Sequence, residues 1–178
     1  MEHDEHSDRA VRESGADDVP SIDFTRFWCR LALNGTGALD MPADGTPPTD
    51  LQISVSLVDT TVMRELNRDY RQRDKPTNVL SFPSGMPVLD TDSGRRLRAL
   101  GDICICPAVV VAEAEEQGKV LRHHWAHLLV HGVLHLCGHD HESDADAEEM
   151  EAIERRVLGE QAIPDPYAGD AVESRIHG

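Results

Sequence analysis

The sequence predicts a single small domain of the α/β (α+β) class, in which helices cover one small mixed β-sheet. Short segments with alternating apolar residues are interleaved with longer segments of helical apolar spacing, which is typical of this class. The length of 178 residues suits one hydrophobic core. No apolar run approaches a membrane span, and no apolar signal region follows the N-terminus. We therefore expect a cytoplasmic protein.

The first part of the chain predicts an acidic extension, a helix and a strand. Residues 1–20 are rich in Asp, Glu and Ser, and we expect them to be disordered. Ser21 can cap a helix that Gly35 ends. Residues 36–50 contain three prolines and indicate a loop. Residues 51–57 alternate apolar and polar side chains, as a half-buried strand does.

The middle of the chain predicts one helix and two further strands. Asp59 can cap a helix that runs to about Tyr70. Residues 78–82 and 102–106 have the short apolar pattern of strands. Between them, residues 84–100 are expected to form a long hairpin-like excursion that carries several arginines.

The last part of the chain predicts three helices. Pro107 suits the first turn of one helix, a second covers about residues 121–137, and Asp144 opens a third. We expect residues 21–167 to form the single domain and residues 168–178 to form a flexible tail. The apolar residues that should face inward from the last helix are Met150, Ile153, Val157 and Leu158.

Histidines near the end of the second of these helices predict a metal site. His131 and His135 are four residues apart, so they lie one turn apart on one helix face and can share a cation. Gly138 can adopt the left-handed backbone that ends the helix. The chain can then fold back and bring His141 to the same point. Three imidazoles and one open position are the ligand set of a catalytic zinc site.

Helical spacing alone leaves more candidates than such a site needs. His127 lies on the same stripe as His131 and His135, and continuing the stripe forward reaches His139. A turn at Gly138 takes His139 off the stripe. The sequence thus predicts one zinc ion per chain, although imidazole suits nickel as well.

The spacing is also that of the metzincin peptidases, so a zinc metallopeptidase is the alternative. Those enzymes carry Glu directly after the first His, where it acts as general base. Here Gly132 occupies that position. Because glycine can neither take nor give a proton, the sequence disfavours a peptidase.

Charge and cysteine content also constrain the function. The net charge is −16, yet residues 60–122 hold 10 of the basic and 9 of the acidic side chains. Positive charge is therefore concentrated in the middle of the chain, where a polyanion such as RNA would bind. The clustered cations are Arg64, Arg68, Arg71, Arg73 and Lys75. The four cysteines are expected to be reduced structural thiols.

Several motifs, in order, closely resemble the YbeY family of metal-dependent endoribonucleases. They are Leu66-Asn67, Tyr70-Arg71, Asp74-Lys75-Pro76-Thr77-Asn78-Val79-Leu80-Ser81-Phe82-Pro83, Gly101-Asp102-Ile103, Glu116-Gln117-Gly118-Lys119, His124-Trp125-Ala126-His127, His131-Gly132-Val133-Leu134-His135-Leu136, Gly138, Asp140-His141 and Glu148-Glu149-Met150-Glu151. The resemblance covers roughly residues 50–167. The chain departs from the family pattern at His139, where an aromatic residue is usual, and over residues 1–20.

The resemblance implies a YbeY-like fold and a single-strand-preferring endoribonuclease. It implies maturation of ribosomal RNA, especially at the 3′ end of the small-subunit RNA, and ribosome quality control. The implied partners are RNA, ribosomal particles and ribosomal proteins, with no DNA and no membrane. A ribosome-assembly factor with a structural metal is a further alternative.

The resemblance also assigns roles to single residues. It gives the third ligand position to His141, which leaves His127 and His139 outside the ligand set. It identifies Arg71 as the catalytic arginine that holds the scissile phosphate. We expect Lys75 to contact the RNA backbone as well. Asp140 is expected to orient a ligand imidazole.

Overall fold

The computed structural model of the chain describes residues 18–39, 49–140 and 143–168. The acidic extension predicted over residues 1–20 lies outside these ranges except for its last three residues. The tail predicted over residues 168–178 lies outside them except for its first.

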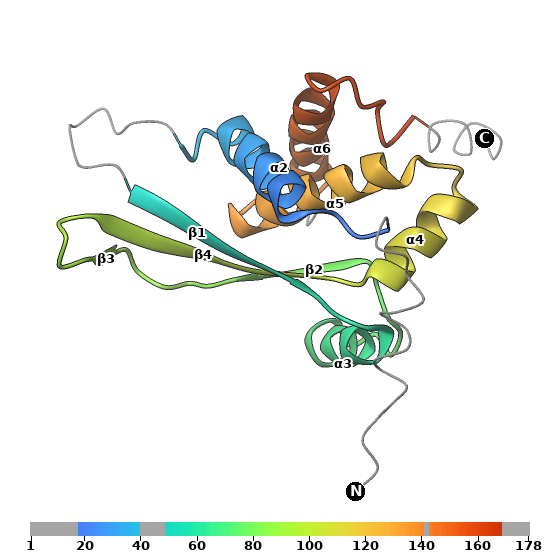
Figure 1. The fold of residues 1–178 in the computed structure, drawn as a ribbon, viewed down its shortest axis with the longest axis horizontal. Helices are drawn as coiled ribbons and strands as arrows, with labels where there is room; N and C mark the ends of the chain where they lie inside the picture. The colour runs from blue at the N-terminus through green and yellow to red at the C-terminus, as the bar shows by residue number, and fades with distance from the viewer. Residues whose placement is uncertain (1–17, 40–48, 141–142, 169–178) are drawn as a thin grey trace, which may run out of the picture.

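A small mixed β-sheet forms the centre of the molecule (Figure 1). Strand β1 (Thr49–Leu57) pairs in parallel with β4 (Arg96–Ile105). On the other side, β4 pairs antiparallel with β2 (Val79–Pro83) and with the short β3 (Leu89–Asp90). The order β1–β4–β2 leaves β2 as an edge strand among the described residues.

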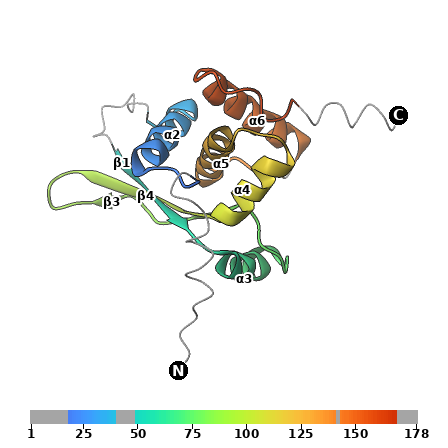
Figure 2. The same ribbon diagram turned by 45° about the vertical axis from the view of Figure 1, so that its right-hand side comes forward.

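Helices cover the two faces of this sheet unequally. Helices α2 (Ile22–Gly35), α5 (Leu121–Leu136) and α6 (Asp144–Gly159) lie on one face, and α5 is the innermost of them (Figures 1 and 2). Helix α4 (Pro107–Glu116) lies beside α5, and α3 (Thr60–Arg71) lies on the opposite face of the sheet. This arrangement confirms the predicted class of a small mixed sheet covered by helices.

Side-chain caps explain where several helices begin. The Ser21 hydroxyl accepts the Phe24 N–H at 3.2 Å, and the Asp59 carboxylate accepts the Val62 N–H at 2.8 Å. Each cap satisfies a backbone donor that the first helical turn leaves without a partner. Ser143 caps α6 in the same way, and α6 begins at Asp144, as predicted.

The prediction for residues 84–100 is wrong in part, because β4 begins at Arg96 and not near Asp102. Its first half pairs with β1 and β3. At Gly101 the backbone has φ +140°, and a Cβ there would clash with the carbonyl oxygen of Phe82. Glycine is therefore required at this point of the strand.

The main core lies between the sheet and its helix-rich face. Most of α5 is buried, and Trp28 from α2 and Leu158 from α6 pack into the same cluster. A smaller cluster of Met63, Leu80 and Cys106 lies under α3. None of the helices within the described residues is long and apolar enough to cross a membrane.

The four cysteines form no disulfide. Burial raises the pKa of the Cys29 thiol to about 11, and burial also raises the pKa of the thiols of Cys104, Cys106 and Cys137. Protonated thiols are poor metal ligands and poor nucleophiles. These thiols therefore suit the predicted structural role.

Candidate metal centre

Helix α5 presents three histidines, each four residues from the next, on its one face that is not fully buried. His127, His131 and His135 are all partly exposed, whereas most other residues of the helix are buried. The helix ends at Leu136, and Gly138 follows with φ +95°. The turn predicted at Gly138 is therefore present. The third predicted ligand, His141, lies outside the described residues.

Two of these histidines face each other through their ring nitrogens. The Nε2 atoms of His131 and His135 are 3.1 Å apart, and their ring centroids are 4.6 Å apart. Both rings come from successive turns of one helix, as their spacing predicted. Two nitrogens at this separation either share a proton or converge on a cation.

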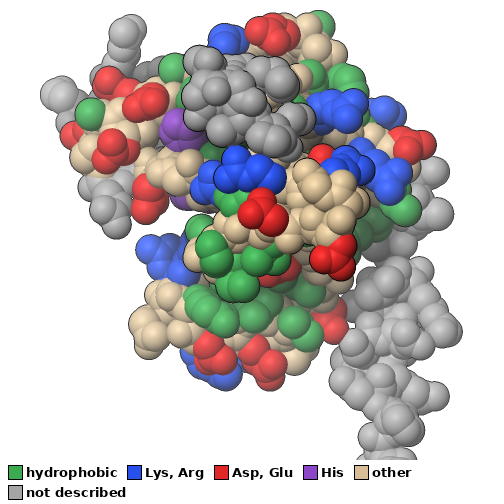
Figure 3. Space-filling model, turned by 90° about the vertical axis from the view of Figure 1, so that its left-hand side faces the viewer, with side chains coloured by type: hydrophobic (Ala, Val, Ile, Leu, Met, Phe, Trp, Pro, Cys, Tyr) green, Lys and Arg blue, Asp and Glu red, His purple; other side chains and the backbone are tan. Residues whose placement is uncertain are grey.

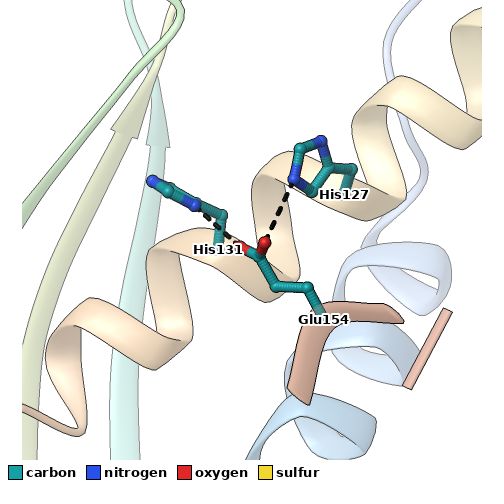
Figure 4. Close-up of side chains that lie close together, drawn as sticks. All are labelled: His127, His131 and Glu154. Atoms are coloured by element: carbon teal, nitrogen blue, oxygen red, sulfur yellow. Dashed lines mark hydrogen bonds and ion pairs between the residues drawn. The ribbon is translucent and has the colours of Figure 1, made fainter. Parts of the chain in front are cut away.

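Glu154 of α6 approaches the other ring nitrogen of His131. Its carboxylate oxygen Oε1 lies 2.7 Å from His131 Nδ1, and Oε2 lies 3.5 Å from His127 Nε2 (Figure 4). The Tyr167 hydroxyl also donates to Oε2. Glu154 is fully buried, with 0% of its surface exposed, so these donors replace the water that a buried carboxylate needs.

Burial alone raises the pKa of Glu154, but hydrogen bonds from His127 and His131 outweigh this effect and hold the pKa well below its ordinary value. The carboxylate is therefore ionised and can only accept hydrogen bonds. Its close contact with His131 requires a proton on Nδ1 of that ring, and the Nε2 atom of the ring faces His135.

One group of described residues lies close enough to bind a metal ion. The ligand atoms of His127, His131 and Glu154 all lie within 4.8 Å of one another. The sequence had placed His127 outside the ligand set, and the structure places it against Glu154 and Tyr167. His131 belongs both to this group and to the predicted pair with His135.

Glu154 is the site residue that sequence reasoning missed. It lies on the inward face of α6, four residues after Met150 and three before Val157, both of which are buried. A carboxylate at an inward position of an amphipathic helix needs a buried partner. The inward position of Glu154 in the helical pattern was therefore the sequence signal that could have identified it. The carboxylate expected from the sequence to orient an imidazole was Asp140.

Gly132 leaves no room for a catalytic side chain at its position. A Cβ there would lie 3.1 Å from two methyl carbons of Ile103 and 3.3 Å from the Ser81 hydroxyl. The Ser81 hydroxyl donates to the Gly132 carbonyl at 3.1 Å and so holds β2 against α5. Gly132 therefore packs tightly against the sheet and supplies no general base.

Arg71 is the last residue of α3, on the other side of β2 from the histidines. Arg64 is paired with Asp74 at 2.7 Å and Arg68 with Asp69 at 3.0 Å. Within the described part of the chain, Arg71 has no such carboxylate partner and is exposed. Figure 3 shows histidine side chains at the edge of a recess, with Lys or Arg side chains and a hydrophobic patch on its other side.

Comparison with known proteins agrees with the motifs. The family model described as Endoribonuclease YbeY matches residues 36–162. Endoribonuclease YbeY of Stutzerimonas stutzeri is 49% identical over 158 residues, which are 89% of each chain. That of Chromohalobacter salexigens is 56% identical over 123 residues, or 68% of this chain and 77% of the relative.

A solution structure of a Thermotoga maritima protein is 25% identical, with a TM-score of 0.49 over 81% of this chain and 87% of that one. The family model covers well over half of the chain, and the two relatives are similar over most of their length. The predicted resemblance is confirmed, and the chain belongs to the YbeY family of endoribonucleases.

Proposed function

We propose that this protein is a zinc-dependent endoribonuclease that hydrolyses single-stranded RNA and matures the 3′ end of small-subunit ribosomal RNA. The proposal rests chiefly on the paired Nε2 atoms of His131 and His135, which are 3.1 Å apart. Membership of a family named for endoribonuclease activity supplies the reaction class. Ribosomal particles are the proposed partners.

We propose His131, His135 and His141 as the metal ligands, and the distance between the first two supports this assignment. Two atoms bound tetrahedrally to zinc, each about 2.0–2.1 Å away, are roughly 3.3 Å apart. The Nε2 separation of 3.1 Å is close to this value. The 2.7 Å between His131 Nδ1 and Glu154 Oε1 is instead an ordinary charge-assisted hydrogen bond. We therefore propose that Glu154 orients His131, and that His141 completes the site.

When bound, zinc supplies Lewis-acid chemistry by polarising the phosphoryl group and lowering the pKa of a water molecule. The protein's own contribution is to orient and to stabilise charge. Glu154 holds His131 in the tautomer that presents Nε2, as a hydrogen-bonded carboxylate does for ligand histidines. Arg71 offers a planar fork of donors to the phosphate oxygens, where negative charge grows in the transition state.

A Glu154→Gln substitution is expected to weaken zinc binding without abolishing it. Glutamine has a similar volume but no charge, so it orients His131 less firmly. Loss of such a supporting contact lowers metal affinity by about 10- to 100-fold. Competition with a chelating dye measures this affinity, and RNA cleavage should recover when zinc is raised to saturation.

Glu113→Gln is the matched control, because Glu113 makes a similar contact of 2.9 Å to His124, away from the paired histidines. This variant should bind zinc like the wild type. If Glu154→Gln lost zinc as completely as His131→Ala, Glu154 would be a direct ligand in the His127, His131 and Glu154 group. Unchanged affinity would show that Glu154 does not orient the site.

The proposed activity is tested with a panel of substrates. The purified protein is incubated with single-stranded RNA spanning the 3′ end of small-subunit precursor RNA, with the same sequence as a duplex, and with casein. We expect internal cleavage of the single strand, slower cleavage of the duplex and no cleavage of casein. Casein cleavage that His135→Ala removes would favour a peptidase, and binding to ribosomal particles with no RNA cleavage would favour an assembly factor.

A further inference from the structure

An aromatic pair of one exposed and one half-buried ring lies on the α3 side of the edge strand β2. Tyr70 of α3 and Phe82 of β2 meet edge to face, with ring centroids 4.7 Å apart and an interplanar angle of 62°. The side of Tyr70 not facing Phe82 is open to water, and the residue is 67% exposed. Such a contact holds an exposed ring in one orientation at little entropic cost.

Unpaired cations directly follow Tyr70 in the chain. Arg71, Arg73 and Lys75 are exposed, and their side chains have no carboxylate partner within the described ranges. The nearby acids Asp69 and Asp74 are already bound to Arg68 and Arg64. The segment around Tyr70 is therefore locally positive although the whole chain carries a net charge of −16.

The aromatic pair and the candidate metal centre lie on opposite sides of one strand. Successive residues of a strand point to opposite faces, so Ser81 points to α5, where it bonds to Gly132 between the two histidines, while Phe82 points to α3. Among the described residues, strand β2 pairs only with β4, so its other edge is open. A nucleic acid strand that crossed this edge would contact both sides.

We propose that Tyr70, supported by Phe82, is a stacking platform for one base of single-stranded RNA, adjacent to the phosphate that is cleaved. This inference rests on the proposed function and adds a determinant of substrate binding to it. Exposed aromatic rings beside unpaired cations are the combination that binds single strands, since rings stack on bases and cations contact phosphates. A base within a duplex is stacked on its neighbours and cannot occupy the platform, so the platform favours single strands.

Exposed hydrophobic side chains also lie in the hairpin region that follows β2. Figure 3 shows hydrophobic side chains gathered between α3 and the hairpin of β3 and β4. Met86 and Leu89 in this hairpin region are 57% and 50% exposed. A protein partner would also suit an apolar surface, but the unpaired cations at its border favour a polyanion.

The test compares Tyr70→Ala, Tyr70→Phe and the control Phe27→Ala on the zinc-loaded protein. Phe27 is likewise an exposed ring, at 48%, in an edge-to-face pair, but it lies on α2 on the other face of the sheet. Because stacking contributes to binding and not to the chemical step, Tyr70→Ala should raise KM for single-stranded RNA about tenfold, leaving kcat nearly unchanged. Tyr70→Phe and Phe27→Ala should both have the KM of the wild type.

A double-mutant cycle with modified RNA identifies the stacked base. Single bases are removed in turn from the RNA, leaving abasic nucleotides near the cleavage site. At one position, base removal should raise KM for the wild type but have no further effect on Tyr70→Ala, since both changes remove the same contact. Additive effects at every position, or a Tyr70→Phe variant as weak as Tyr70→Ala, would overturn the inference.

The stacking platform and the proposed function can be rejected by different results. A wild-type protein that cleaves RNA and a Tyr70→Ala variant with unchanged KM would reject the stacking platform and leave the proposed function standing. If Tyr70→Ala kept the wild-type KM for RNA but no longer bound a ribosomal protein, the apolar surface would be assigned to a protein partner. A wild-type protein that cleaves no RNA would reject the proposed function and the platform with it.

Discussion

A His135→Ala variant is expected to lose most of its zinc and nearly all of its RNA cleavage. The substitution removes one of the two facing Nε2 atoms. Metal-based stabilisation of a transition state amounts to several kcal/mol, which corresponds to a loss of about a thousandfold or more in rate. Metal content by elemental analysis and cleavage rate should fall together.

Two further histidines provide the controls for this experiment. His139→Ala should keep both zinc and activity, because we place His139 outside the ligand set. His127→Ala should keep most of its zinc, since we assign that ring to the support of Glu154. A His127→Ala variant without zinc, beside a His135→Ala variant that retains it, would select the His127, His131 and Glu154 group as the metal site.

An Arg71→Glu variant is expected to lose cleavage while keeping its metal and its stability. Arg71 is exposed at the end of α3 and has no ion-pair partner within the described residues, so its replacement disturbs little of the fold. Removal of one donor to a developing negative charge costs about 100- to 1,000-fold in kcat. Single-turnover cleavage at saturating RNA measures this loss, and metal content and Tm should match the wild type.

Arg98→Glu is the matched control for Arg71. Arg98 is also an exposed arginine, but it lies on β4, and we assign it no role at the scissile phosphate. This variant should bind RNA more weakly and still reach the wild-type kcat at saturating RNA. Equal losses of kcat in the two variants would mean that Arg71 acts only as one of several positive charges.

Most elements of the fold could be predicted because their signals are local. The caps at Ser21 and Asp59 lie within three residues of the groups that they bind. The first half of β4 could not be found in this way. Its residues become a strand by pairing with β1 and β3, and that pairing depends on long-range contacts.

In the candidate site, too, local features could be predicted from the sequence and long-range contacts could not. The facing of His131 and His135 follows from their spacing on one helix. The contact between His131 and Glu154 joins residues 23 positions apart in the chain, and it depends on how α5 and α6 pack. The role of Arg71 came from the family resemblance, since spacing alone did not distinguish it from Arg68 or Arg73.

The central claim is that a zinc ion held by His131, His135 and His141 is required for RNA cleavage. The most direct test is a zinc titration of chelator-treated wild-type protein, with bound zinc and cleavage rate measured on the same samples. We expect the rate to rise in proportion to bound zinc up to one ion per chain, with unchanged circular dichroism. Full cleavage of RNA by protein that contains almost no metal would contradict the claim.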